Sequence, residues 1–147
     1  MKKAVWITLG WLCVMLWMGT AAFAQDQYTE GTVERVILLR ILPGHANAFW
    51  EDLKKNVQPI YEQEKAQGLI DGYQVFLNQT KGHPEDWDVG IALTYKNMAA
   101  LDGLGMKVLD LRMKQYGNKQ SEQQVINKRV ENTQTVSSYL IRNVALK

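Results

Sequence analysis

Two histidines are the side chains of this 147-residue sequence that are best suited to acid–base chemistry near neutral pH. His45 follows a Pro43-Gly44 turn, where an imidazole could accept a proton or bind a metal or a haem iron. His83 stands in a Gly-His-Pro loop that could close over the mouth of a cavity. Neither has a carboxylate at metal-ligand spacing, so no metal site is predicted. Both remain candidate catalytic bases, with an ordinary turn or loop residue as the alternative for each.

One arginine stands out in an apolar segment, residues 32–42, that is rich in β-branched side chains. A buried arginine needs an ionic or hydrogen-bonding partner, so Arg40 either forms a structural ion pair or contacts an anionic ligand. Glu34, Asp88 or the stretch at 142–143 could lie beside it in a sheet. Arg40 is therefore a candidate ligand-binding residue, and a structural ion pair is the alternative.

Five large aromatic side chains could line a cavity for a flat, apolar molecule, although the same residue types also fill ordinary cores. They are Trp50, Tyr61, Trp87, Tyr95 and Tyr139. No glycine-rich phosphate loop, Gly-x-Ser-x-Gly motif or paired-carboxylate motif accompanies them. Ordinary hydrolase, kinase and dinucleotide-dependent functions therefore lose support. A cofactor-free enzyme needs only a shaped pocket and one base, so no cofactor is predicted, with haem as the alternative.

The spacing of apolar residues predicts the elements that position these side chains. Residues 32–42 have the pattern of a strand that is covered on both faces, and residues 47–68 that of a helix with one buried stripe. Pro59 lies inside this helix and lacks a backbone donor, which predicts a kink near Asn56. The charged run at 62–65 is interpreted as a solvated helix face. Three further strands are expected, at 73–78, 87–95 and 136–146. Two further helices are expected between the last two of these strands, one from Asn97 to Tyr116 and a polar one at 121–133. Gly103 and Gly105 should weaken the first of these helices.

The strand at 87–95 alternates large and small side chains. Its large residues are expected on one face, and they are Trp87, Val89, Ile91, Leu93 and Tyr95. On the other face, Gly90 and Ala92 leave room for a closely packed element.

The order strand, helix, strand, strand, helix, extra helix, strand predicts an α+β fold of the ferredoxin-like β-α-β-β-α-β type. Such a fold has a four-stranded antiparallel sheet with helices on one face. Because the strands carry large apolar residues on both faces, the other face of the sheet also needs a cover. A second copy of the chain can provide it, so we expect a homodimer.

Several of these features resemble the dimeric α+β-barrel superfamily, which includes antibiotic-biosynthesis-monooxygenase-like and related stress-responsive domains. They are the leading strand, the Pro43-Gly44-His45 turn, the helix through Phe49-Trp50, and a strand pair followed by a helix. The resemblance covers most of residues 33–146. It implies a barrel made by two sheets, with a ligand cavity between the sheet and the helices of each subunit. Members include cofactor-free oxygenases, haem-degrading enzymes, haem-dependent peroxidases and lactone-forming or isomerising enzymes.

The first 24 residues depart from an ordinary member of that superfamily and have the pattern of a signal peptide. Lys2-Lys3 precede an apolar run, and Ala22-Phe23-Ala24 matches the small-x-small cleavage pattern. Export, with a periplasmic location, is the expectation. A retained membrane anchor is the alternative, whereas a lipoprotein cleaved before Cys13 would keep an apolar tail. Residues 25–31 are expected to be a flexible lead-in, and residues 32–147 a single domain.

The charge balance of the mature chain excludes two classes of partner. The full sequence has 17 basic and 15 acidic residues, and removal of Lys2 and Lys3 with the leader leaves 15 of each. No basic footprint for nucleic acid or an anionic membrane remains. The only cysteine, Cys13, lies in the leader, so the mature chain can form no disulfide.

Three functions remain open. The first is an exported homodimeric domain that binds a small hydrophobic or aromatic molecule in a pocket between the sheet and the first helix. The second is a cofactor-free monooxygenase or isomerase-like enzyme, with His45 or His83 as its base. The third is a structural or interaction module without activity.

Overall fold

The computed structural model describes residues 27–147, so the predicted signal peptide lies outside the described residues. The described residues divide into two compact units, residues 31–143 and the chain ends, 27–30 with 144–147. Within the described part of the chain ends, the backbone N–H of Lys147 donates a hydrogen bond to the carbonyl of Gln27 at 3.2 Å. The helices and the cavity described below belong to residues 31–143.

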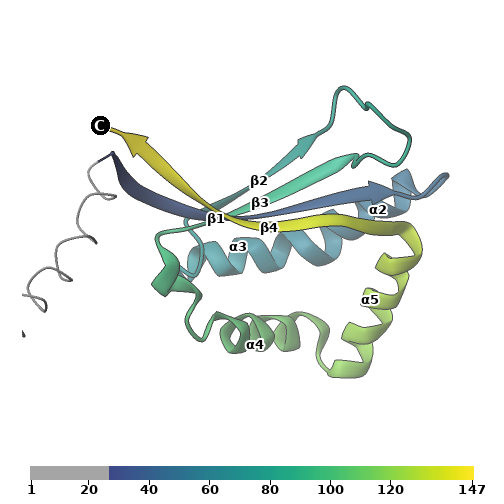
Figure 1. Cartoon of the computed structure of the whole chain (residues 1–147). Coiled ribbons are helices and arrows are strands. Elements are labelled where there is room, and N and C mark those ends of the chain that lie inside the picture. Colours follow the sequence, from purple (N-terminus) through teal and green to yellow (C-terminus); the bar gives the residue numbers. More distant parts are fainter. Residues whose placement is uncertain (1–26) are drawn as a thin grey trace, which may run out of the picture. The chain divides into compact units, whose positions relative to one another are not determined.

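The elements follow the predicted β-α-β-β-α-β order (Figure 1). The strands are β1 (Tyr28–Ile41), β2 (Gly72–Leu77), β3 (Val89–Tyr95) and β4 (Thr133–Leu146). The helical segments are α2 (Ala46–Asp52), the π-helical η1 (Leu53–Val57), α3 (Gln58–Ala66), the 3-10 helix η2 (Met98–Leu101), α4 (Leu104–Tyr116) and α5 (Lys119–Asn132). Because β1 begins at Tyr28, residues 28–31 belong to a strand and not to the predicted lead-in.

The four strands form one antiparallel sheet in the order β2-β3-β1-β4, which is the ferredoxin-like order. In the pairing of β1 with β3, Val33 lies opposite Tyr95 and Leu39 opposite Val89. Leu77, at the end of β2, also lies opposite Val89, from the other side of β3. Within residues 31–143, the helices lie on one side of this sheet (Figure 1). The predicted fold class is confirmed.

The core lies between the sheet and the helices. Residues that lie opposite one another in neighbouring strands point to the same face, so the odd-numbered residues of β1 and β3 share the face that the helices cover. The buried cluster comprises Val33, Phe49, Leu53, Ile70, Val89, Ile91, Leu93, Tyr95 and Leu104. It holds α2, η1 and the start of α4 against β1 and β3.

The other face of the sheet explains the small residues of β3. Gly90 lies opposite Phe76, whose ring fills the space above the glycine: a Cβ at Gly90 would lie 2.1 Å from Cε2 of Phe76. Trp87 meets the same ring edge-on, with 5.6 Å between the ring centroids. The space that the sequence predicts over Gly90 is therefore present, and the side chain of Phe76 from the neighbouring strand β2 fills it. The prediction that Trp87 shares a face with Val89 is wrong, because Trp87 precedes β3 and turns towards Phe76.

The predicted kink in the first long helix is confirmed as a π-helical turn. Pro59 has no N–H to donate, and η1 directly precedes the turn of α3 that contains it. Here the N–H of Gln58 reaches the carbonyl of Leu53, five residues earlier. The hydroxyl of Tyr116, at the end of α4, donates a hydrogen bond of 2.9 Å to the carbonyl of Asn56. A hydroxyl group from α4 thus provides a hydrogen-bond donor for one backbone carbonyl of the interrupted helix.

The helix predicted from Asn97 to Tyr116 is interrupted at Gly103, as its glycines indicate, and forms η2 and α4. Asn97 caps η2 by accepting a hydrogen bond from the N–H of Ala100, and Gly103 has a left-handed φ of 66° just before α4. Gly105 lies inside α4, with no atom within 4 Å of where its Cβ would be. None of the helices among residues 27–147 has the length and apolar character required to cross a membrane.

Candidate functional site

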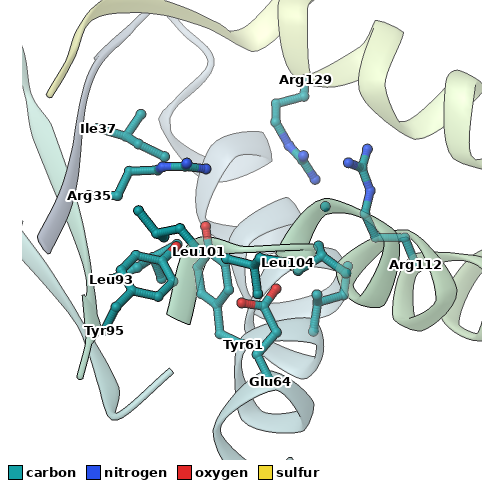
Figure 2. A pocket seen from close by; sticks show the side chains of 13 residues that line it. Arg35, Ile37, Tyr61, Glu64, Leu93, Tyr95, Leu101, Leu104, Arg112 and Arg129 are labelled. Atoms are coloured by element: carbon teal, nitrogen blue, oxygen red, sulfur yellow. The ribbon is translucent and has the colours of Figure 1, made fainter. Parts of the chain in front are cut away.

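A cavity of about 430 Å³ lies between the helix-covered face of the sheet and the helices α3, α4 and α5 (Figure 2). Its apolar wall consists of Ile37, Ile60, Leu93, Leu101, Leu104 and Val108. Its polar side chains are Arg35, Tyr61, Glu64, Tyr95, Arg112 and Arg129. The cavity therefore has an apolar wall with several charged or hydroxyl groups, which is the usual composition of a small-molecule site.

The periods of strand and helix bring these residues together. Arg35 and Ile37 are two residues apart on β1, and Leu93 lies opposite Arg35 on β3. On α3, Ile60 and Glu64 are one helical turn apart and share a face. Residues 104, 108 and 112 recur every four positions on α4. Regular secondary structure on both sides thus fixes the cavity walls.

Glu64 is the most unusual side chain in the cavity. Only 3 % of its surface is exposed, and among the described residues its carboxylate forms no hydrogen bond and no ion pair. The carboxylate points into the cavity (Figure 2). Burial raises the pKa of Glu64 above its ordinary value, while the charges of Arg35 and Arg112 act in the opposite direction. The cavity thus holds a carboxylate that can accept or return a proton.

Two tyrosine hydroxyls border the same space. Burial, with a contribution from Glu64, raises the pKa of Tyr61 to about 12. Burial also raises the pKa of Tyr95. Both phenols therefore stay neutral near neutral pH, and neither hydroxyl has a hydrogen-bond partner among the described residues. They are available as hydrogen-bond donors to a bound molecule.

The three arginines differ in their partners. Nε of Arg112 lies 2.6 Å from a carboxylate oxygen of Glu122, and Nε of Arg129 lies 2.6 Å from one of Asp52. Arg35 forms no ion pair or hydrogen bond among the described residues, and its guanidinium extends from β1 towards the cavity (Figure 2). Arg35 is therefore the cationic group that is free to meet an anion here.

Of the five aromatic residues predicted to line a pocket, Tyr61 and Tyr95 line this one. Trp50 lines a smaller cavity of about 180 Å³ on the other side of Tyr61. Trp87 packs on Phe76, and half of the surface of Tyr139 on β4 is exposed. The structure thus brings two of the five together and places the other three elsewhere.

Arg40 and the two histidines do not line the cavity. Arg40 donates a hydrogen bond to Gln134 and lies 3.9 Å from the carboxylate of Glu85, so its partners are structural. Nδ1 of His45 is 2.7 Å from Oδ1 of Asn132. His83 is exposed, and its ring accepts a hydrogen bond from the backbone of Glu85.

Sequence reasoning missed Glu64 and Arg35. The charged run at 62–65 is not wholly solvated, because Glu64 is buried while Glu62 is exposed. The signal was the spacing: Glu64 follows Ile60 by four residues on the buried stripe of the helix. Arg35 has the same position in the strand period as Ile37, on the face that the helices cover.

Across residues 27–147, no three or more His, Cys, Asp or Glu side chains gather in a way that could hold a metal ion. The polar side chains that line the cavity can offer hydrogen bonding, ion pairing and proton transfer.

No protein-family model matches the sequence, and no curated protein sequence does. Among solved structures, the chain is similar to two dimeric ferredoxin-like proteins from uncultured marine organisms. The first has 8 % sequence identity and a TM-score of 0.46, over 81 % of this chain and 90 % of that one. The second has 13 % identity and a TM-score of 0.47, over 81 % of this chain and 98 % of that one.

A third similar structure is an EthD-like protein from Ralstonia eutropha, with 10 % identity and a TM-score of 0.39, over 80 % of this chain and 93 % of that one. The strand order of the present chain is itself ferredoxin-like. The strand order confirms the ferredoxin-like fold that the sequence predicts, and membership of the dimeric α+β-barrel superfamily stays a prediction.

Proposed function

We propose that this chain is an exported, homodimeric domain that binds a small, largely apolar molecule in the cavity between the sheet and α3. The observation that carries this proposal is Glu64, a buried carboxylate without a direct partner at the wall of the cavity. Such a group costs stability unless something polar meets it, and function is a common reason for keeping it.

The walls define the kind of molecule that fits. A volume of about 430 Å³ is within the usual range of ligand cavities, about 300–1,000 Å³. The leucines and isoleucines suit a flat apolar or aromatic body. Arg35 suits one anionic group on that body, the Glu64 carboxylate can accept a hydrogen bond from a hydroxyl group, and the Tyr95 hydroxyl can donate one to a carbonyl group.

Fluorescence of 8-anilinonaphthalene-1-sulfonate tests the proposal, because this probe has a flat apolar body and one anionic group. We expect saturable binding to the mature chain, with an emission increase. Gly105 lines the cavity and has open space at its Cβ position, so Gly105→Phe should fill part of the cavity and weaken binding at least about tenfold. The matched control is Met106→Phe, since Met106 is the next residue on α4 and is 68 % exposed.

Equal binding by the wild type and Gly105→Phe would contradict the proposal, because the probe would then bind elsewhere. Absence of binding by every variant would favour a structural or interaction module.

The homodimer is supported by apolar surface on the sheet. Val36 and Leu38 are half-buried on the face of β1 opposite the helices. Several apolar residues of β4 are exposed by 43–50 %, and they are Val136, Tyr139, Leu140 and Ile141. Consecutive residues of β4 point to opposite faces, so only some of these side chains share the uncovered face with Val36 and Leu38. Exposed apolar side chains on this face and on the edge strand favour association, and a second copy presents the same residues.

Export is supported by the basic start, the apolar run and the Ala22-Phe23-Ala24 pattern of the leader. Mass spectrometry of the protein from a periplasmic fraction should give a chain that begins at Gln25. A chain that keeps residues 1–24 and sediments with membranes would instead support the anchor.

A further inference from the structure

We infer that the cavity is a proton-transfer site in which Glu64 takes a proton from a carbon atom of a bound carbonyl or heteroaromatic compound. This inference rests on the proposed function, because the compound must first bind in the cavity. It replaces the histidines as candidate bases with a residue that borders the cavity.

The geometry supports this role because three elements direct four complementary groups at one space. α3 supplies the Glu64 carboxylate and the Tyr61 hydroxyl, β3 supplies the Tyr95 hydroxyl, and β1 supplies the Arg35 guanidinium (Figure 2). The carboxylate is a base with free lone pairs, since no residue of the described chain is hydrogen-bonded to it. The hydroxyls and the guanidinium can stabilise an oxygen atom that becomes negative.

The surroundings of Glu64 also make it a stronger base than an ordinary carboxylate. Burial raises its pKa, which brings the carboxylate closer to the basicity that suits a general base near neutral pH. The charged or titratable groups around it are Tyr61 on its own helix, Arg35 on β1, Tyr95 on β3, Arg112 on α4 and Arg129 on α5. Arg35 and Arg112 limit the increase in the pKa of Glu64 and so favour its ionised, basic form.

The simplest reaction of this kind is an isomerisation. A Glu64 oxygen removes the proton from a carbon next to a carbonyl group, and the C–H electron pair forms a C=C bond. The carbonyl electrons move onto oxygen, where Arg35 and the tyrosine hydroxyls meet the charge. Where a second C=C bond is conjugated to this enolate, return of the proton from the Glu64 carboxyl to the far carbon of that bond shifts the double bond and restores the carbonyl group. The proton is conserved, and no oxidant or other co-reactant is consumed.

Cleavage of 5-nitrobenzisoxazole tests for such a base without knowledge of the natural compound. The base takes the C–H proton, the C–H electron pair forms a nitrile, the N–O bond breaks, and a coloured nitrophenolate is released. We expect cleavage by the mature protein to be at least about 10²-fold faster than by Glu64→Gln, the usual contribution of a positioned base. The rate should increase with pH as Glu64 ionises and then reach a plateau.

Glu62→Gln is the matched control, since Glu62 lies on the same helix, is exposed and bonds only to the hydroxyl of Tyr73. It should cleave at the wild-type rate. Glu64→Asp keeps the carboxylate but moves it back, so its rate should lie between those of the wild type and Glu64→Gln. This variant keeps the test decisive if Glu64→Gln does not fold.

Cleavage by Glu64→Gln at the wild-type rate would overturn the inference, as would a wild-type protein no faster than Gly105→Phe. If the naphthalene probe still binds the wild type and not Gly105→Phe, the proposed binding function stands while proton transfer fails. If the probe does not bind at all, the proposed function fails as well.

Discussion

Glu64 couples the stability of this fold to pH. Burial raises the pKa of its carboxyl above the ordinary value of 4.5, so the folded chain holds the proton more tightly than the unfolded chain. Stability from this group is therefore present at low pH and is lost as pH rises through the pKa of the folded state.

We predict that Glu64→Gln is more stable than the wild type at about pH 8, by about 1 kcal/mol, the order of the cost of desolvating a polar group, because burial disfavours the ionised carboxylate. The advantage should disappear as pH falls below 4.5, where the wild-type carboxyl is protonated in both the folded and the unfolded chain. Thermal unfolding across this pH range measures the difference. Glu62→Gln should show no such trend, and an advantage of Glu64→Gln that grows towards low pH would contradict the account.

Gly90 gives a second prediction at the scale of one residue. A Cβ there would overlap the ring of Phe76, which also packs against Trp87. We therefore expect Gly90→Ala to cost about 1–3 kcal/mol of unfolding free energy in urea, the usual cost of overpacking. In a Phe76→Leu background the ring is absent, and the same substitution should cost much less. An equal cost in both backgrounds would mean that the ring does not set the requirement for glycine.

The sequence predicts the aromatic residues of the cavity better than its charged residues. Tyr61 and Tyr95 were predicted as cavity residues because aromatic side chains at buried spacing point inward. The sequence singles out Arg40 and gives no separate signal for Arg35, which the structure places at the cavity. The two arginines have opposite positions in the strand period, and one strand alone does not reveal which face the helices cover.

The interrupted helix shows what is predictable at the scale of elements. Pro59 removes a backbone donor, so a break near Asn56 follows from local sequence. The compensating partner, Tyr116, is 60 residues further along the chain, at the end of α4. Only the packing of α4 beside α3 brings it there, so the sequence could not reveal it.

We predict that Tyr116→Phe loses about 1 kcal/mol of stability, because the Asn56 carbonyl loses its hydroxyl donor. Hydrogen exchange should also be faster around η1 than in the wild type. Tyr139→Phe is the control: Tyr139 is half exposed, and its hydroxyl has no partner among the described residues. Equal stability of both variants would show that the bond contributes nothing measurable.

At the scale of the molecule, the order of strands and helices was sufficient to predict the ferredoxin-like sheet. The cavity was not predictable in the same way, because side chains of the same types line cavities and fill cores. Its volume depends on how far α4 and α5 stand from the sheet, and that distance is a property of the packed fold.

The apolar surface of the sheet predicts self-association. We expect residues 25–147 to sediment as a dimer, and Ile141→Lys to shift the protein to a monomer, because a charge would then lie in the interface. Ile141 is 43 % exposed and shares its strand face with Asn143, which bonds to Thr32 and Glu34 on the uncovered face of β1. Met106→Lys changes an exposed residue of α4 in the same way and should remain dimeric. A wild-type chain that sediments as a stable monomer would refute the dimer.

The location of a bound molecule tests the central claim most directly. Two-dimensional NMR spectra of the mature protein, recorded during titration with 8-anilinonaphthalene-1-sulfonate, report which residues contact the probe. The account predicts that the largest shifts fall on Arg35, Tyr61, Glu64, Tyr95 and Leu104. Shifts confined to the exposed residues of β4, with those five unchanged, would contradict it.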